Sequence, residues 1–163
     1  MSFGEGSGTD YEIARGRDWP SVRQYNVFLA NRLGAMMDLV RRFESSDIRI
    51  VSMTVVDSAD CAIIRIVPHD PERAKEVLRQ GRFMATESDL LVVKIPDVSQ
   101  PLATICKALL SAEISIDYAY PLMTGVGPEE HMAMAMHVDD HETAVQTLLD
   151  KGFTIYTEGD LHW

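Results

Sequence analysis

The 163-residue sequence has only two cysteines and no apolar run of the length that a membrane span needs, about 18 residues. We therefore expect no membrane association. Cys61 and Cys106 each lie inside an apolar segment and lack the CxxC partner of zinc and redox sites, which predicts buried structural thiols. The N-terminus also lacks the basic and then hydrophobic pattern of a signal peptide, so we expect a cytoplasmic protein.

Positive charge is scarce as well. Fifteen lysines and arginines stand against 25 aspartates and glutamates, which gives a formal net charge of −10. Proteins that bind nucleic acids usually present a basic face, so we expect no nucleic-acid partner. The chain contains no Walker loop, HExxH or GxSxG motif. We therefore expect no catalytic residues, no enzyme activity, no cofactor and no metal site.

Apolar periodicity and turn signals predict six elements in the order strand, helix, strand, strand, helix, strand, followed by the same six again. The first set comprises a strand at 25–30, a helix at 35–44, strands at 48–56 and 61–67, a helix at 71–80 and a short strand at 82–86. The second set comprises a strand at 90–95, a helix opening at 99–101, strands at 114–123 and 131–138, a helix opening at 139–142 and a strand at 153–157.

Two stretches of the first set match stretches of the second set. Residues 46–50 match 112–116, and residues 70–74 match 140–144, a spacing of 66 and then 70 residues. An internal repeat of this size indicates two copies of one module. We predict modules at 21–88 and 89–163, preceded by a flexible tail of small and polar residues at 1–20.

Right-handed crossovers would place both helices of each module on one face of a four-stranded antiparallel sheet. The predicted fold class is therefore α+β, with two tandem ferredoxin-like βαββαβ modules. The other sheet face and the edge strands need cover. We expect the modules to pair edges or stack faces, and two chains to form a homodimer.

Several helix ends carry clear signals. Asp70 followed by Pro71 predicts an N-cap and the first residue of a helix, and Gly81 predicts the end of that helix. Asp139 together with Glu142 fits a capping box and predicts the start of the last helix.

The turn Asn31-Arg32-Leu33-Gly34-Ala35-Met36 joins the first strand to the first helix. Glycine lets a ligand approach the backbone closely, because it has no Cβ. The first turn of a helix offers unpaired N–H groups and the positive end of the helix dipole, which together suit a carboxylate or phosphate. The Asn31 amide can donate and accept hydrogen bonds. The same spacing also fits a plain helix start in which glycine only reverses the chain.

The repeated pattern resembles the ACT domain, an amino-acid-sensing module of many regulated metabolic enzymes, over residues 21–161. In that family the corresponding turn has Asn or Asp, two variable residues, Gly, a small residue and Leu, which the turn at 31–36 resembles. The sequence at 34–55 is most similar to the regulatory subunit of acetolactate synthase.

The resemblance implies that an amino acid binds between the glycine turn of one module and the second strand of a facing module. In the second copy Asp97 stands at the place of Asn31, but Gln100 replaces the glycine and Pro101 removes an N–H group. We therefore expect one working site type, in the first module. The ligand-binding residues that the resemblance implies are Asn31, Leu33, Gly34, Ala35, Ile50 and Asp97.

The leading functional prediction is a non-catalytic regulatory protein that senses a small metabolite, in the first instance an amino acid, and that acts as a free-standing regulator or as a regulatory subunit. If the acetolactate synthase resemblance holds, the ligand is a branched-chain amino acid and the partner is the catalytic subunit of that enzyme. The alternative is a module that binds no ligand and assembles with a partner enzyme. An enzyme of unknown chemistry on a ferredoxin-like scaffold is a third hypothesis, because fold alone does not determine function.

Overall fold

The computed structural model describes residues 19–30 and 32–161. The predicted tail at 1–20 lies outside the described residues except for Trp19 and Pro20, and so does the predicted ligand-binding residue Asn31. Of the two described tail residues, Pro20 is buried, and its carbonyl oxygen lies 2.8 Å from Nε2 of His141.

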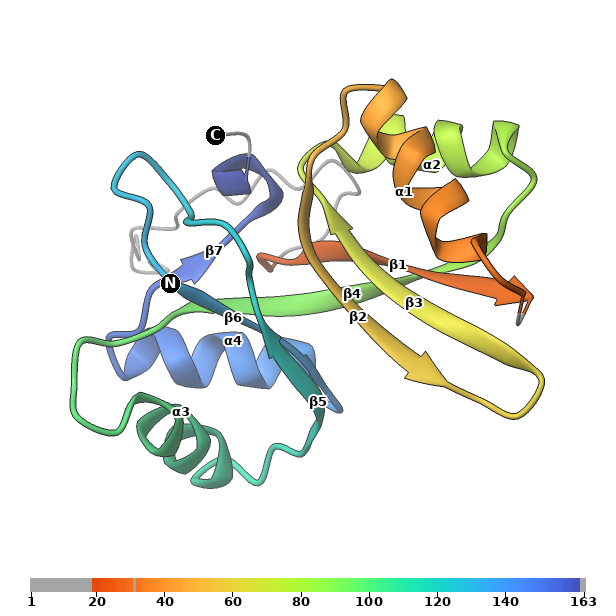
Figure 1. Cartoon of the computed structure of the whole chain (residues 1–163). Coiled ribbons are helices and arrows are strands. Elements are labelled where there is room, and N and C mark those ends of the chain that lie inside the picture. Colours follow the sequence, from red (N-terminus) through yellow and green to blue (C-terminus); the bar gives the residue numbers. More distant parts are fainter. Residues whose placement is uncertain (1–18, 31, 162–163) are drawn as a thin grey trace, which may run out of the picture.

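The observed elements follow the predicted order, with helices and strands alternating as expected (Figure 1). The first six are β1 (Val22–Ala30), α1 (Ala35–Ser45), β2 (Ile50–Asp57), β3 (Cys61–Pro68), α2 (Pro71–Gln80) and β4 (Met84–Lys94). The others are α3 (Pro101–Leu110), β5 (Ile116–Pro121), β6 (Ala133–Val138), α4 (His141–Asp150), β7 (Ile155–Tyr156) and the short 3₁₀ helix η1 (Glu158–Leu161).

Strand β4 is one continuous strand where the sequence predicted two, at 82–86 and at 90–95. The strand order is β2-β3-β1-β4-β6-β5, and β7 also pairs with β4. The first part of β4 pairs with β1, from Met84 opposite Phe28 to Leu90 opposite Val22. The last part pairs with β6 and β7. The proposed boundary between residues 88 and 89 falls inside this shared strand, and the division into two modules remains a prediction.

We use "first unit" for the elements from β1 to the start of β4, and "second unit" for those from the end of β4 to η1. Helices α1 and α2 cover one face of the first unit's sheet, and α3 and α4 cover one face of the second unit's sheet (Figure 1). The two faces without helices pack against each other. Their shared core consists of Val22, Val51, Val67, Leu90, Val92, Tyr120, Leu122, Val126, Ala133, Ala135, Tyr156 and Leu161.

The side chains of β4 alternate between two cores. Leu91 and Val93 pack with the residues under α3 and α4, whereas Leu90 and Val92 point into the core between the two sheets. Successive side chains of a strand point to opposite faces, so both sides of this part of β4 are buried. Face-to-face stacking of the units, one of the two expected arrangements, is therefore confirmed together with the sharing of a strand.

The repeat is also visible in the backbone. Asp70 accepts a hydrogen bond from the Arg73 N–H at 3.1 Å, and Asp140 accepts one from the Thr143 N–H at 3.1 Å. Both aspartates are N-caps, with φ values of −126° and −129°. The predicted cap of the last helix, Asp139, is therefore wrong by one residue. The Asp139 side chain instead accepts a hydrogen bond from the Ser115 N–H at 3.0 Å.

The prediction that both cysteines are buried is wrong. Cys106 is exposed and Cys61 is partly exposed. In α3 the buried positions are Ile105, Ala108 and Leu109, whereas Cys106 is exposed beside an apolar pocket between α3 and strands β5 and β6. Cys61 is the first residue of β3, beside the hairpin turn.

No helix among the described residues is long and apolar enough to cross a membrane.

Candidate functional site

The turn between β1 and α1 leaves the backbone open at Gly34. Gly34 is the N-cap of α1 and has a φ of +83°, a left-handed conformation that favours glycine. A Cβ built on Gly34 would meet no atom within 4 Å. Gly34 has no side chain that could cap α1, in contrast to the aspartates that cap α2 and α4. The Ala35 N–H donates to the Arg32 carbonyl at 3.3 Å, so a small anion would meet the other N–H groups of the first turn of α1.

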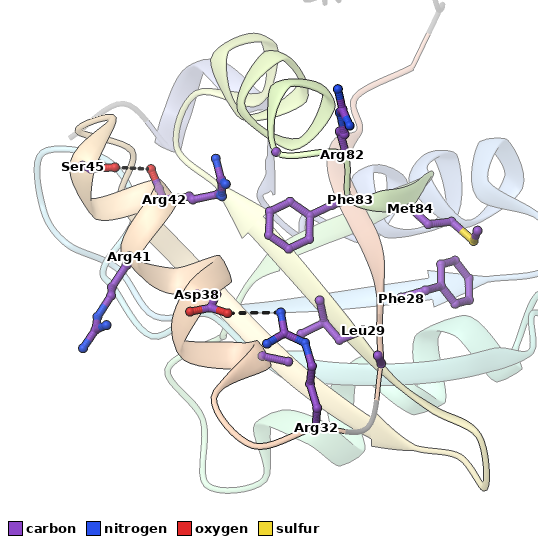
Figure 2. A pocket seen from close by; sticks show the side chains of 13 residues that line it. Phe28, Leu29, Arg32, Asp38, Arg41, Arg42, Ser45, Arg82, Phe83 and Met84 are labelled. Carbon is purple, nitrogen blue, oxygen red and sulfur yellow. Dashed lines mark hydrogen bonds and ion pairs between the residues drawn. The ribbon is translucent and has the colours of Figure 1, made fainter.

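A pocket of about 680 Å³ lies beside this helix start (Figure 2). We call it the first pocket. It is bounded by the end of β1, by α1 and by the turn from α2 into β4. The residues that line it are Phe28, Leu29, Ala30, Arg32, Ala35, Asp38, Arg41, Arg42, Ser45, Gly81, Arg82, Phe83 and Met84. Its volume lies within the range of roughly 300–1,000 Å³ that is usual for small-molecule sites.

The first pocket is rich in positive charge. Among the described residues, four arginines line it and Asp38 is the one carboxylate. Arg32 pairs with Asp38, with Nη2 and Oδ2 3.2 Å apart, and both side chains are largely exposed. The Arg42 guanidinium lies 5.8 Å from the centre of the Phe83 ring. Figure 2 shows Arg42 reaching from α1 towards Phe83, while Arg41 and Arg82 point outward at the rim.

The structure gathers only part of the predicted ligand-binding set. Ala35 lines the first pocket and Gly34 immediately precedes it. Leu33 is 102% exposed and points into solvent. Ile50 packs against the core under α1 and α2 and does not line the first pocket.

Asp97, the remaining member of the set, lies in the loop between β4 and α3, which Figure 1 shows at the opposite end of the molecule from the β1–α1 turn. Asp97 lines a second pocket of about 420 Å³. Ile50 and Asp97 therefore do not meet Gly34 within one chain, and the set as a whole remains a prediction for a site between facing modules. The residues of this second pocket are Lys94, Pro96, Asp97, Thr104, Lys151, Gly152, Phe153 and Thr154.

Sequence reasoning missed the arginines of the first pocket. Helical spacing places Arg41 and Arg42 on the side of the helix that faces away from the core, which predicts a solvated surface, and Arg82 stands forty residues further along the chain. The signal that was present is the contrast between the repeats, because the second copy has Lys107 and Ala108 in place of the arginine pair.

A buried polar cluster lies between the two sheets. The side-chain amide of Gln24 on β1 donates to Asn26 at 2.7 Å and to the Tyr118 hydroxyl at 2.8 Å. Its carbonyl oxygen accepts a hydrogen bond from the Tyr120 hydroxyl. Burial raises the pKa of Tyr120 above its ordinary value. Arg65 on β3 lies 3.7 Å from the centre of the Tyr118 ring. The cluster joins the two units through polar contacts in addition to their apolar core.

A second contact between the units centres on Arg23, whose side chain is only 2% exposed. Its Nε and Nη2 donate to the carboxylate of Glu158 in η1 at 2.7 and 3.0 Å. Its Nη1 pairs with Glu72 on α2. The hydrogen bond with Glu158 raises the pKa of Arg23 above its ordinary value, although burial alone would lower it. Arg23 thus ties the C-terminal segment to the first unit.

Metal ligands do not gather in the structure. Among residues 19–30 and 32–161, no group of three or more His, Cys, Asp or Glu side chains is placed to hold a metal ion.

Solved structures share this architecture. A protein from Bacteroides thetaiotaomicron superposes with a TM-score of 0.78 at 20% identity, covering 87% of this chain and 96% of that chain. The ligand-free regulatory subunit of aspartate kinase from Thermus thermophilus superposes with a TM-score of 0.53 at 10% identity, covering 80% and 91%. These similarities establish the fold alone. No curated protein sequence matches the chain significantly.

The family is given by a sequence model. The model of the ACT domain pair matches residues 20–162, which is most of the chain. The paired arrangement that it describes agrees with the two repeated units seen here. The chain therefore belongs to the ACT domain pair family.

Proposed function

We propose that the protein is a non-catalytic regulatory protein that binds a small metabolite, in the first instance an amino acid, at the start of α1 beside the first pocket. The observation that carries this proposal is the exposed backbone at Gly34, whose φ of +83° and open surroundings leave room for a ligand at the helix N-terminus.

The surroundings of Gly34 suit a zwitterion. A carboxylate gains from the N–H groups and the dipole at the start of α1. Asp38, one turn into the helix, offers a carboxylate to the ligand's amino group, and Arg32 beside it offers a cation to an anionic group. Leu29 and Phe83 supply apolar lining. These features support binding of an amino acid and require no catalytic group.

Regulation would follow from a population shift. A ligand that favours one arrangement of the units stabilises it by its difference in affinity, and a partner enzyme responds to that arrangement. Strand β4 begins at Met84, which lines the first pocket, and continues into the second unit. A change at the pocket therefore has a direct structural route to the second unit.

The regulated enzyme is a finer part of the proposal. The resemblance of residues 34–55 to the acetolactate synthase regulatory subunit favours a branched-chain amino acid and a catalytic subunit of that enzyme as partner. A place in the cytoplasm is a separate part of the proposal. The comparisons identify the family and no particular enzyme, so these points remain predictions.

A thermal-shift screen against the twenty amino acids tests the proposal. A ligand at 100 times its dissociation constant stabilises the folded state by about 2.7 kcal/mol, which raises the melting temperature by several degrees. We expect Gly34→Ala to abolish this shift, because the new Cβ would occupy the space above the backbone and the residue would disfavour the left-handed conformation.

The matched control is Gly127→Ala. Gly127 has a φ of +71° and, like Gly34, has no atom within 4 Å of the place that a Cβ would take, but it lies in the turn before β6 and lines neither pocket. Both substitutions should cost about 1–2 kcal/mol in backbone strain, and only Gly34→Ala should remove the ligand response. A ligand response that persists in Gly34→Ala would rule out this site.

One observation favours the alternative of an assembly module. Three exposed apolar side chains lie close together in the sequence: Leu33 in the turn between β1 and α1, and Met36 and Met37 in the first turn of α1. Apolar side chains grouped on a surface often mark an interface with another chain, and a homodimer would cover them. A screen without any shift, together with a stable dimer in sedimentation, would support this alternative.

A further inference from the structure

The two pockets occupy equivalent places in the internal repeat. With the spacing of 66 residues early and 70 residues later, position 31 corresponds to Asp97, Asp38 to Thr104, and Phe83 to Phe153. Asp38 and Phe83 line the first pocket, and all three counterparts line the second. The fold therefore forms the same kind of hollow twice.

The backbone around the two hollows is also equivalent. The Phe83 N–H donates to the Leu78 carbonyl at 3.0 Å, and the Phe153 N–H donates to the Leu148 carbonyl at 2.9 Å. The residue before each phenylalanine is in the left-handed region, with φ values of +55° and +82°. The backbone around the two pockets is therefore alike. Side-chain differences between the pockets do not follow from a difference in this part of the backbone.

The main difference is positive charge. Three of the four arginines of the first pocket have neutral counterparts and the fourth has a lysine counterpart. The pairs are Arg32 with Val98, Arg41 with Lys107, Arg42 with Ala108, and Arg82 with Gly152. The second unit folds with neutral residues at three of these places, so its copy of the fold needs no positive charge there.

These arginines are also poorly neutralised. In the described part of the chain, Arg32 has an ion-pair partner in Asp38, and no carboxylate pairs with Arg41, Arg42 or Arg82. Four of the fifteen basic residues thus line one pocket of a chain whose net charge is −10. A small anion in this pocket would meet positive charge that no carboxylate of the described chain neutralises, apart from the pair between Arg32 and Asp38.

We propose that the first pocket binds a small anion with at least two negative charges, either a dicarboxylate or a phosphoryl compound. This inference deepens the proposed function and rests on it. One anionic group lies at the start of α1, and the second lies between Arg32 and Arg42, where a planar guanidinium binds carboxylate or phosphate with paired hydrogen bonds. A neutral branched-chain side chain would leave these arginines unused.

Isothermal titration of the full chain with aspartate and asparagine tests the inference, because the two ligands have nearly the same shape and differ by one charge. We expect aspartate to bind at least tenfold more tightly than asparagine. Arg32→Val and Arg42→Ala, which install the residues that the second unit has at these places, should each weaken aspartate binding about tenfold. Binding of asparagine should change less.

Lys107→Ala is the matched control. It removes one positive charge from the repeat counterpart of Arg41, on a helix that contributes no residue to the first pocket. We expect this variant to bind aspartate as the unchanged protein does. Succinate and inorganic phosphate, used as further probes, separate the two sources of charge.

Each result decides something different. Succinate or phosphate binding as tightly as aspartate, with the same dependence on Arg42, would support the dianion inference and contradict the amino-acid part of the proposed function. Valine or leucine binding while aspartate, succinate and phosphate do not would overturn the dianion inference and leave the proposed function intact. Equal affinity for aspartate and asparagine would also overturn it. Binding by none of these probes would overturn both.

Discussion

Arg23→Ala is expected to lower the free energy of unfolding by about 3–5 kcal/mol, because removing one partner of a buried ion pair leaves the other charge uncompensated. The carboxylate left without a partner is that of Glu158, whose side chain is 14% exposed. The side chain of Glu72 is 67% exposed and stays hydrated. For a chain of this length the melting temperature should fall by about 10 °C. Chemical denaturation followed by circular dichroism measures the change.

Arg79→Ala is the control for Arg23→Ala. Arg79 pairs with Glu76 at 2.7 Å, but both side chains are exposed on α2, and exposed pairs contribute little to stability. We expect no measurable change in this variant. The double variant Arg23→Met with Glu158→Leu should recover much of the lost stability, since it leaves no buried charge. A small effect of Arg23→Ala, equal to that of Arg79→Ala, would contradict the role assigned to this contact.

Gln24→Ala is expected to lower the free energy of unfolding by about 3 kcal/mol. Gln24 is fully buried between the two sheets, and its side chain is hydrogen-bonded to Asn26, Tyr118 and Tyr120. The substitution opens a cavity and leaves the buried Tyr120 hydroxyl without an acceptor, and each of these effects is destabilising. Thermal and urea unfolding measure the loss.

The test of the Gln24 prediction compares single and double variants. Gln146→Ala is the control, because Gln146 is exposed on α4 and its side chain bonds to Asp150 on the same helix, at 2.8 Å. Tyr120→Phe combined with Gln24→Leu should cost less than the sum of the two single changes, since it removes both ends of one hydrogen bond. If the free-energy costs of the two single changes simply add up in the double variant, the hydrogen bond between Gln24 and Tyr120 does not couple the two residues.

The Arg23 and Gln24 contacts bear on regulation because both connect the two units. Arg23 and Gln24 are neighbours on β1, with Arg23 bound to η1 and Gln24 bound to β5. Elements joined by buried polar contacts and a shared strand tend to unfold as one cooperative system. We therefore expect a single unfolding transition for the chain, and a ligand at α1 should raise the stability of both units together.

Much of the fold was accessible from the sequence because local signals dominate there. Asp70, Pro71 and Gly81 define both ends of α2 by capping chemistry, and the structure places that helix at Pro71–Gln80 as predicted. The repeat alignment was more reliable than the local capping signal in one case. Asp140, which the alignment pairs with Asp70, is the N-cap of α4, whereas the capping-box pattern favoured Asp139.

Features that depend on tertiary contacts were not accessible. No turn interrupts residues 87–89, yet the sequence pattern does not show that one strand serves both units, because this follows from β1 pairing with one part and β6 with the other. The exposure of Cys106 depends on which side of α3 meets the sheet.

The candidate site was accessible in part. The glycine turn at Gly34 was found from a local motif, and Ala35 does line the first pocket. Arg82 joins that pocket from a turn far along the chain, so its charge could not be assigned to the site before the fold was known. Ile50 and Asp97 were taken from the resemblance, and their positions relative to Gly34 also depend on the fold. In the structure they do not meet Gly34 within one chain.

The measurement that tests the central claim most directly is a two-dimensional amide NMR titration of the full chain with the ligand that the screen identifies. We predict that the largest shifts fall on the backbone amides of Gly34 and Ala35 at the start of α1, and on Phe83 across the first pocket. Shifts confined to the second pocket around Asp97, or an unchanged spectrum at saturating ligand, would contradict a regulatory site at the start of α1.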